Sequence, residues 1–282
     1  QAPPGRDLSR RMTQYFDTHA HYDSGKFNAD RSDVLRAVHE SGVALIVDPG
    51  DCAVTSARAV AIAQAYDFVY ATVGWHPEEA AGWTDDSLNQ IRALASQPKV
   101  CAIGEIGLDY YWDTSTKATQ ETMLRAQLEL ALELDLPVII HDREAHGDSL
   151  RIVCDYPGLR GVFHCFSGSV EMARELLRRG WYLGFDGPIT YKNAVKALDV
   201  IAACPADRML LETDSPYLAP VPNRGKRNFS GNLPYVVEKL AEIKGVSAEE
   251  IIRETAKNAR ALYRITEQEF RDDQTDRTAI SE

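Results

Sequence analysis

The sequence predicts a single-domain α/β fold, a (β/α)₈ barrel of the TIM type. Eight short apolar segments alternate with segments of helical periodicity, and most of the apolar segments run without interruption, as strands do when both faces of a parallel sheet are buried. Polar residues of metal-ligand type follow several of these strands, and a closed ring brings such strand ends to one point. The length of 282 residues suits one barrel.

The first half of the chain alternates strand and helix from Tyr15 onward. Apolar residues beginning at Tyr15 lead into His19 and His21, so the first strand is expected there. The segment 31–41 has helical spacing and stops at Gly42. Strands are then predicted at 43–47, 68–75 and 100–105, with helices at 53–65 and 84–95.

The second half continues the alternation and ends in helices. Strands are predicted at 137–141, 161–164, 181–185 and 209–214, with helices at 117–134, 144–155 and 170–179. No helix is predicted between the seventh and eighth strands. Two amphipathic helices at 235–244 and 248–263 are expected to pack on the outside of the barrel.

One domain is expected to span residues 15–265. Residues 1–14 lack periodicity and are interpreted as a disordered leader or tag remnant, while 266–282 form a polar C-terminal tail. A doubly wound open sheet also fits alternating strands and helices. We favour the barrel because the polar residues follow strands 1, 4, 5, 6 and 8, whose ends only a closed ring would bring together.

The composition excludes several classes of protein. The formal net charge of −11 argues against a protein that coats polyanions, although a metal site and one basic loop could still attract nucleic acid. No apolar run approaches the roughly 20 residues that span a bilayer, which indicates a soluble, cytoplasmic protein with no membrane partner. The five cysteines are scattered and form no CxxC pair, so neither a disulfide framework nor a zinc ribbon is suggested.

Six residues of metal-ligand type are predicted where strands give way to turns. His19 and His21 are two positions apart, so in an extended chain they share a face and could hold one ion together. The full set is His19, His21, Glu105, His141, His164 and Asp214. Unrelated core or surface residues would explain one or two of these positions easily but six of them poorly. Imidazole nitrogen and carboxylate oxygen suit divalent ions, and two such ions need a bridging carboxylate, for which Glu105 is the candidate.

The residues around these positions resemble the TatD family of metal-dependent deoxyribonucleases, within the amidohydrolase-like barrels. The resemblance runs from about Tyr15 to Tyr263 and rests on specific motifs: DTHAH at 17–21, GWHP at 74–77, AIGEIGLDY at 102–110, LPVIIH at 136–141, HCFSG at 164–168, ETDSPYLAP at 212–220 and RGKRN at 224–228. It implies a TIM-like barrel, two or three divalent ions (Mg²⁺, Mn²⁺ or Zn²⁺) on the six residues, and hydrolysis of DNA, with single strands or strand ends as the expected substrate.

Acidic residues depart from the family pattern at two places. After the histidine of the fifth strand the family usually has Ser-Arg-Asp-Ala, whereas this chain has Asp142, Arg143, Glu144 and Ala145. At the end of the seventh strand Asp186 replaces small residues. Both changes put negative charge near a site for a polyanion, so they either bind a further ion or indicate a different substrate.

The expected mechanism assigns a role to each candidate. The ions and Glu105 hold an activated water, Asp214 takes its proton, and His76 contacts the substrate and is the alternative base. Substrate phosphates are expected to meet the metals and a set of polar side chains: Arg143, Ser167, Arg224, Lys226 and Arg227. The same site could instead cleave aminoacyl-tRNA, lactones or other small esters and amides, and a non-catalytic scaffold is the alternative from another class.

Overall fold

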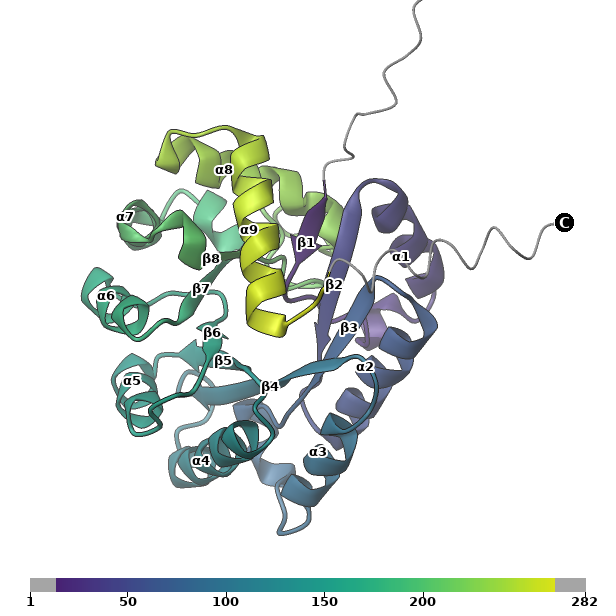
Figure 1. Ribbon diagram of the computed structural model, residues 1–282, viewed down its shortest axis with the longest axis vertical. Helices are drawn as coiled ribbons and strands as arrows, with labels where there is room; N and C mark the ends of the chain where they lie inside the picture. Colours follow the sequence, from purple (N-terminus) through teal and green to yellow (C-terminus); the bar gives the residue numbers. More distant parts are fainter. Residues whose placement is uncertain (1–13, 267–282) are drawn as a thin grey trace, which may run out of the picture.

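Eight parallel strands form one sheet whose spatial order follows the chain, which confirms the predicted barrel (Figure 1). This computed structural model describes residues 14–266, so the predicted leader and tail lie outside the described residues except for 14 and 266. The strands are β1 Tyr15–Asp17, β2 Val43–Pro49, β3 Val69–Val73, β4 Val100–Asp109, β5 Val138–Arg143, β6 Gly161–Phe163, β7 Tyr182–Phe185 and β8 Met209–Leu211.

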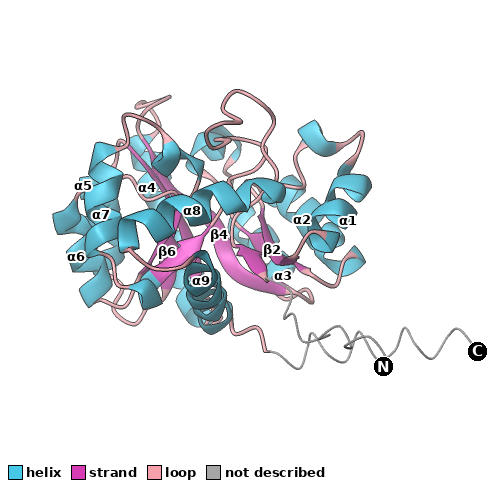
Figure 2. Ribbon diagram, turned by 90° about the horizontal axis from the view of Figure 1, so that it is seen from above, coloured by secondary structure: helices cyan, strands magenta, loops and turns pink. Residues whose placement is uncertain are grey.

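Helices surround the strands on the outside (Figure 2). They are α1 Arg31–Glu40, α2 Ala53–Ala65, α3 Ser87–Ala95, α4 Lys117–Glu133, α5 His146–Cys154, α6 Val170–Arg178, α7 Val195–Ala203, α8 Leu233–Lys244 and α9 Ala248–Tyr263. None of the helices between residues 14 and 266 is long and apolar enough to cross a membrane.

The structure corrects several predicted boundaries. Helix α7 was not predicted, because it buries only Val200 and Ile201 and so lacks a long apolar stripe. Helix α3 begins at Ser87 rather than at 84. Strands β4 and β5 pair with each other beyond the predicted ends, as far as Asp109 and Arg143, whereas β8 stops at Leu211.

The amino end of the barrel is closed by helix α9. Phe16, Leu45 and Leu210, each near the start of its strand, pack in one cluster with Leu262 and Tyr263 of this helix. Figure 1 shows α9 lying next to β1 and β8. The helix was expected as a closing helix on the outside of the barrel, and it forms the floor at the amino end, which leaves the carboxyl ends of the strands for the site.

The first and last strands are joined mainly through the residues that follow them. The Thr18 amide donates to the Leu211 carbonyl at 3.0 Å, and the Asp214 amide donates to the His19 carbonyl at 2.9 Å. The buried Asp17 carboxylate accepts from the Thr213 amide at 3.1 Å and from the Thr213 hydroxyl at 2.7 Å. We call these contacts the β1–β8 seam. They place the residues after β1 and β8 side by side.

Candidate metal centre

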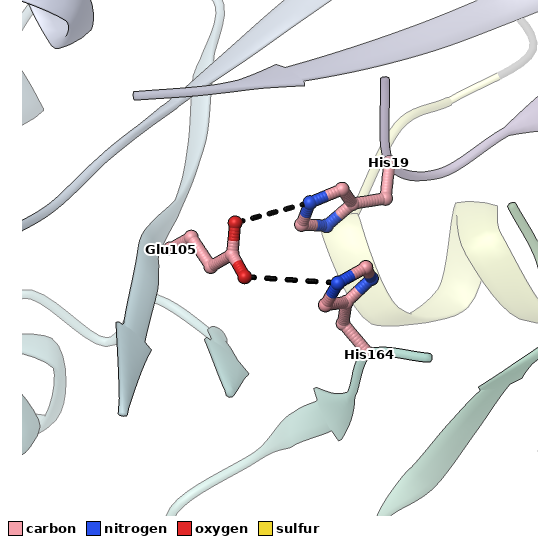
Figure 3. Close-up of side chains that lie close together, drawn as sticks. All are labelled: His19, Glu105 and His164. Carbon is pink, nitrogen blue, oxygen red and sulfur yellow. Dashed lines mark ion pairs between the residues drawn. The ribbon is translucent and has the colours of Figure 1, made fainter. Parts of the chain in front are cut away.

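The carboxylate of Glu105 lies at the centre of a group of histidines. Glu105 belongs to β4 and is 3% exposed. Five imidazoles approach within 3.6 Å of it, those of His19, His21, His76, His141 and His164. Figure 3 shows His19 and His164 each directing a ring nitrogen at a different oxygen of Glu105, at 3.2 and 3.6 Å. Their rings stack with centroids 3.6 Å apart.

The two oxygens of Glu105 face two different sets of ligands. Oε2 lies near the Nε2 atoms of His19 and His21, at 3.2 and 3.4 Å. Oε1 lies 2.9 Å from His141 Nδ1 and 3.6 Å from His164 Nε2. One carboxylate therefore joins two clusters, an arrangement typical of a bridging ligand.

Asp214 completes the first cluster. Its Oδ1 lies 3.7 Å from His19 Nε2 and 3.6 Å from His21 Nε2, and these two nitrogens are 3.2 Å apart. Asp214 has φ 56°, in the left-handed region that costs most residues about 1–2 kcal/mol but that aspartate tolerates better. The bond from its amide to the His19 carbonyl holds this conformation.

The donor set fits divalent cations. Candidate ligand atoms of His19, Glu105 and His164 lie within 4.8 Å of one another, as do those of His19, His21 and Asp214. Within the described residues, the buried His19 Nδ1 makes no hydrogen bond, and a neutral imidazole that carries its proton on one nitrogen offers the lone pair of the other, here Nε2, to a metal. Imidazole and carboxylate ligands of this kind suit first-row divalent ions and, through oxygen, Mg²⁺.

The electrostatics of the centre shift the pKa values of the candidate ligands in different directions. Burial lowers the pKa of His19 to about 4 and that of His164 to about 3, so both rings are neutral at pH 7. Burial disfavours the Glu105 carboxylate, but the imidazoles around it outweigh this effect and hold its pKa well below the usual range. Burial raises the pKa of Asp214 to about 8, against the charge of His21, so this carboxyl binds a proton readily.

Outer hydrogen bonds orient the histidines, and sequence reasoning missed the carboxylates that make them. Asp109 Oδ2 lies 2.9 Å from His141 Nε2, and burial of His141 is outweighed by Asp109 and Glu105, which raise its pKa to about 10. Glu212 Oε2 lies 3.1 Å from His164 Nδ1. Such partners fix the orientation of a ligand ring. The one available signal was proximity, since Asp109 is in the Glu105 motif and Glu212 in the Asp214 motif.

Two glycines make room for these groups. A Cβ on Gly184 would lie 2.2 Å from Glu212 Oε1, and one on Gly107 would lie 1.9 Å from the His141 carbonyl oxygen. Gly107 also has φ 151°. A larger residue at either position would force the neighbouring strands apart.

The three acidic residues that depart from the family pattern occupy different environments. Asp142 Oδ2 pairs with His146 Nδ1 at 2.8 Å, and Glu144 is exposed. Asp186 is 1% exposed, and burial together with the charges of Asp214 and Glu212 raises its pKa well above the usual value. Its neutral form is therefore favoured, which reduces the negative charge it would otherwise bring to the site.

The predicted substrate-contacting residues are dispersed around the centre. His76 lies on the Glu105 side, with its Nδ1 accepting from the Glu78 amide at 3.1 Å. Arg143 and Ser167 are exposed after His141 and His164. In the loop after β8, Arg227 pairs with Asp30 at 2.6 Å.

The other two cations of that loop also contact neighbouring groups. The Arg224 guanidinium lies 4.4 Å from the centroid of the Tyr191 ring, and Lys226 Nζ is 3.4 Å from Asn223 Oδ1. Gly225 has φ 86°, so it serves the turn between these two cations. Of the three cations, Arg227 is the one whose charge is already paired with a carboxylate.

A parallel barrel with histidines and carboxylates gathered at the carboxyl ends of its strands defines the class of metal-dependent TIM-barrel hydrolases. Within that class, the chain belongs to the family of TatD related DNases, whose model matches residues 16–264.

Similar proteins cover nearly the whole barrel. A metal-dependent hydrolase of Bacillus subtilis, YabD, is 44% identical over 89% of this chain and 99% of its own length. A protein of Cronobacter sakazakii named 3'-5' ssDNA/RNA exonuclease TatD is 36% identical over 88% of this chain and 97% of its own. The crystal structure of YjjV, a TatD homologue of Escherichia coli, has a TM-score of 0.85 at 35% identity, covering 89% of this chain and 98% of that one.

Proposed function

We propose that this metal-dependent hydrolase cleaves phosphodiester bonds of single-stranded DNA, at or near a chain end, with two divalent ions held on the two sides of Glu105. The observation that carries the proposal is the division of the Glu105 oxygens, because each oxygen faces its own set of imidazoles: His19 and His21 at Oε2, and His76, His141 and His164 at Oε1. The name of the Cronobacter relative supports a single-stranded substrate and attack from an end.

Each ion would have its own ligands. His19, His21 and Asp214 would hold the first together with Glu105 Oε2. His141 and His164 would hold the second with Glu105 Oε1. A pair of divalent ions bridged in this way supplies an activated water and neutralises charge on the phosphate.

The side chains of this protein would orient the reactants and move the proton. Asp214, ionised when it ligates an ion, would accept the proton of the attacking water. Glu105 remains ionised and would keep the two halves of the centre at a fixed spacing. His76 is within 3.6 Å of Glu105 and would reach a substrate oxygen from the opposite side to Asp214.

Cations around the rim would bind the phosphates of the chain. Arg143 is exposed at the end of β5, and Arg224 and Lys226 extend from the loop after β8. Arg227 would contribute less, because Asp30 already neutralises it. Ser167 would offer a hydroxyl beside His164.

The experiment is a substrate panel with purified protein and Mg²⁺, Mn²⁺ or Zn²⁺. Single-stranded and duplex DNA, labelled at either end, are compared with charged tRNA and small esters. We expect stepwise shortening of single strands that ceases with excess EDTA. Turnover of esters with no cleavage of any nucleic acid would refute the proposal, as would full nuclease activity after dialysis into EDTA.

A further inference from the structure

Two large aromatic side chains are exposed on the loop after β4. Tyr111 is 54% exposed and Trp112 is 65% exposed, whereas most aromatic side chains of the described residues lie in or against the core. Their rings meet edge to face with centroids 4.8 Å apart. A tryptophan exposed to this degree contributes little hydrophobic free energy to folding, and exposed aromatic side chains often mark a binding site.

A cation joins this pair from the neighbouring strand. The Arg143 guanidinium, at the end of β5, lies 3.9 Å from the centroid of the Tyr111 ring and 5.3 Å from that of the Trp112 ring. We call Tyr111, Trp112 and Arg143 the aromatic platform. Lys117 adds a second local cation, with Nζ 4.0 Å from the centroid of the Tyr110 ring.

One carboxylate connects the aromatic platform to the metal centre. Asp109 Oδ1 accepts from the Tyr111 amide at 2.9 Å and from the Trp112 amide at 3.4 Å. Its other oxygen lies 2.9 Å from His141 Nε2. The loop that carries the aromatic rings is therefore fixed by the same group that orients a candidate ligand.

We propose that the aromatic platform is a nucleobase-stacking subsite, which holds a base of the single-stranded substrate next to the scissile phosphate. Rings provide a face for any base, and the guanidinium provides a donor for the adjoining phosphate, the combination by which proteins hold single strands without reading sequence. The inference rests on the proposed function. Two cations lie at this loop, Arg143 against the rings of the platform and Lys117 against Tyr110.

The binding test uses the full-length protein and a short oligonucleotide with 2-aminopurine at successive positions from the 3' end, in EDTA so that no cleavage occurs. Stacking on the aromatic platform quenches the fluorescence of one position more than that of the others. Trp112→Leu and Tyr111→Leu retain apolar bulk and are exposed, so both variants are expected to fold. Each should weaken binding by about 5- to 100-fold.

The matched control is Tyr156→Leu. Tyr156 also lies near an arginine, with the Arg125 guanidinium 6.0 Å from its ring centroid, but it comes two residues after the end of helix α5, away from the carboxyl end of β5. We expect binding by this variant to match the wild type. An equal reduction in the control would overturn the proposal, because the effect would then be general.

A kinetic test separates this proposal from the proposed function. With metal, Trp112→Leu should raise KM for a normal oligonucleotide by the same factor while kcat stays within about twofold. On an oligonucleotide with an abasic site at the quenched position, the variant and the wild type should differ little. Unchanged KM for Trp112→Leu, where the wild type does cleave DNA, would refute the stacking subsite alone, whereas absence of cleavage by the wild type would refute the nuclease.

Discussion

Replacing Glu105 by glutamine should remove one ion from the centre and leave the other. The amide keeps the shape of the side chain, but its nitrogen cannot ligate a metal. Because each oxygen of Glu105 faces a separate set of imidazoles, replacing one oxygen affects one set directly. We expect the bound metal to fall from about two ions per chain to about one, and hydrolysis to fall by at least roughly 100-fold, since both ions contribute to the reaction.

The expected change in stability follows from linkage. An ion present at about 100 times its dissociation constant stabilises the folded state by about 2.7 kcal/mol, so two ions contribute about 5 kcal/mol. In a protein of this size each kcal/mol shifts Tm by about 2–4 °C, which predicts a metal-induced gain of about 10–20 °C for the wild type. The glutamine variant should gain about half as much.

The assay is elemental analysis after dialysis, paired with thermal melts with and without metal. Glu212→Gln is the matched control, because this buried carboxylate contacts the outer nitrogen of His164 rather than the centre. It should keep two ions but bind them about 10- to 100-fold more weakly. Two ions at full occupancy in Glu105→Gln would refute the bridging role.

Three further outcomes are expected. Asp214→Asn should keep the fold and reduce turnover by at least roughly 100-fold, as measured by single-turnover kinetics; a rate near wild type would transfer the role of base to His76. Arg224→Ala/Lys226→Ala should lower the log–log slope of affinity against salt by about 0.7 for each phosphate that is no longer bound, while the metal content stays the same. An unchanged slope would show that the loop does not contact the substrate. Arg227→Ala should change that slope less, because Asp30 already pairs with its charge; salt titrations of oligonucleotide binding would measure both.

Most of the fold could be predicted because its signals are local. Short apolar runs and turn residues located all eight strands, and parallel pairing of neighbours follows from the helices between them. Helix α7 escaped prediction because just two of its residues are buried. The ends of β4 and β5 were wrong because their final residues pair with each other, and periodicity in one strand carries no information about its partner.

The gathering of the six ligand-type residues was predictable from the sequence, but the groups that surround them were not. The six ligand-type residues follow or lie in strands that can be recognised from local sequence, and the structure brings these residues together around Glu105. The roles of Asp109 and Glu212 depend on side chains from other strands. The pairing of Arg227 with Asp30 likewise joins segments 197 positions apart, which no local pattern reveals.

The β1–β8 seam has a consequence for the order of events during synthesis. The buried Asp17 carboxylate accepts hydrogen bonds from the Thr213 hydroxyl, 196 positions later in the chain, and from the Ser230 hydroxyl, 213 positions later. Neither bond can form until those residues have been synthesised. A ribosome-bound chain that ends before Thr213 therefore holds His19 and His21 without the segment that positions Asp214. Closure of so distant a contact is entropically costly and slow. The ring should close late, so that the cluster of His19, His21 and Asp214 is complete only after β8 and the residues that follow it have left the ribosome.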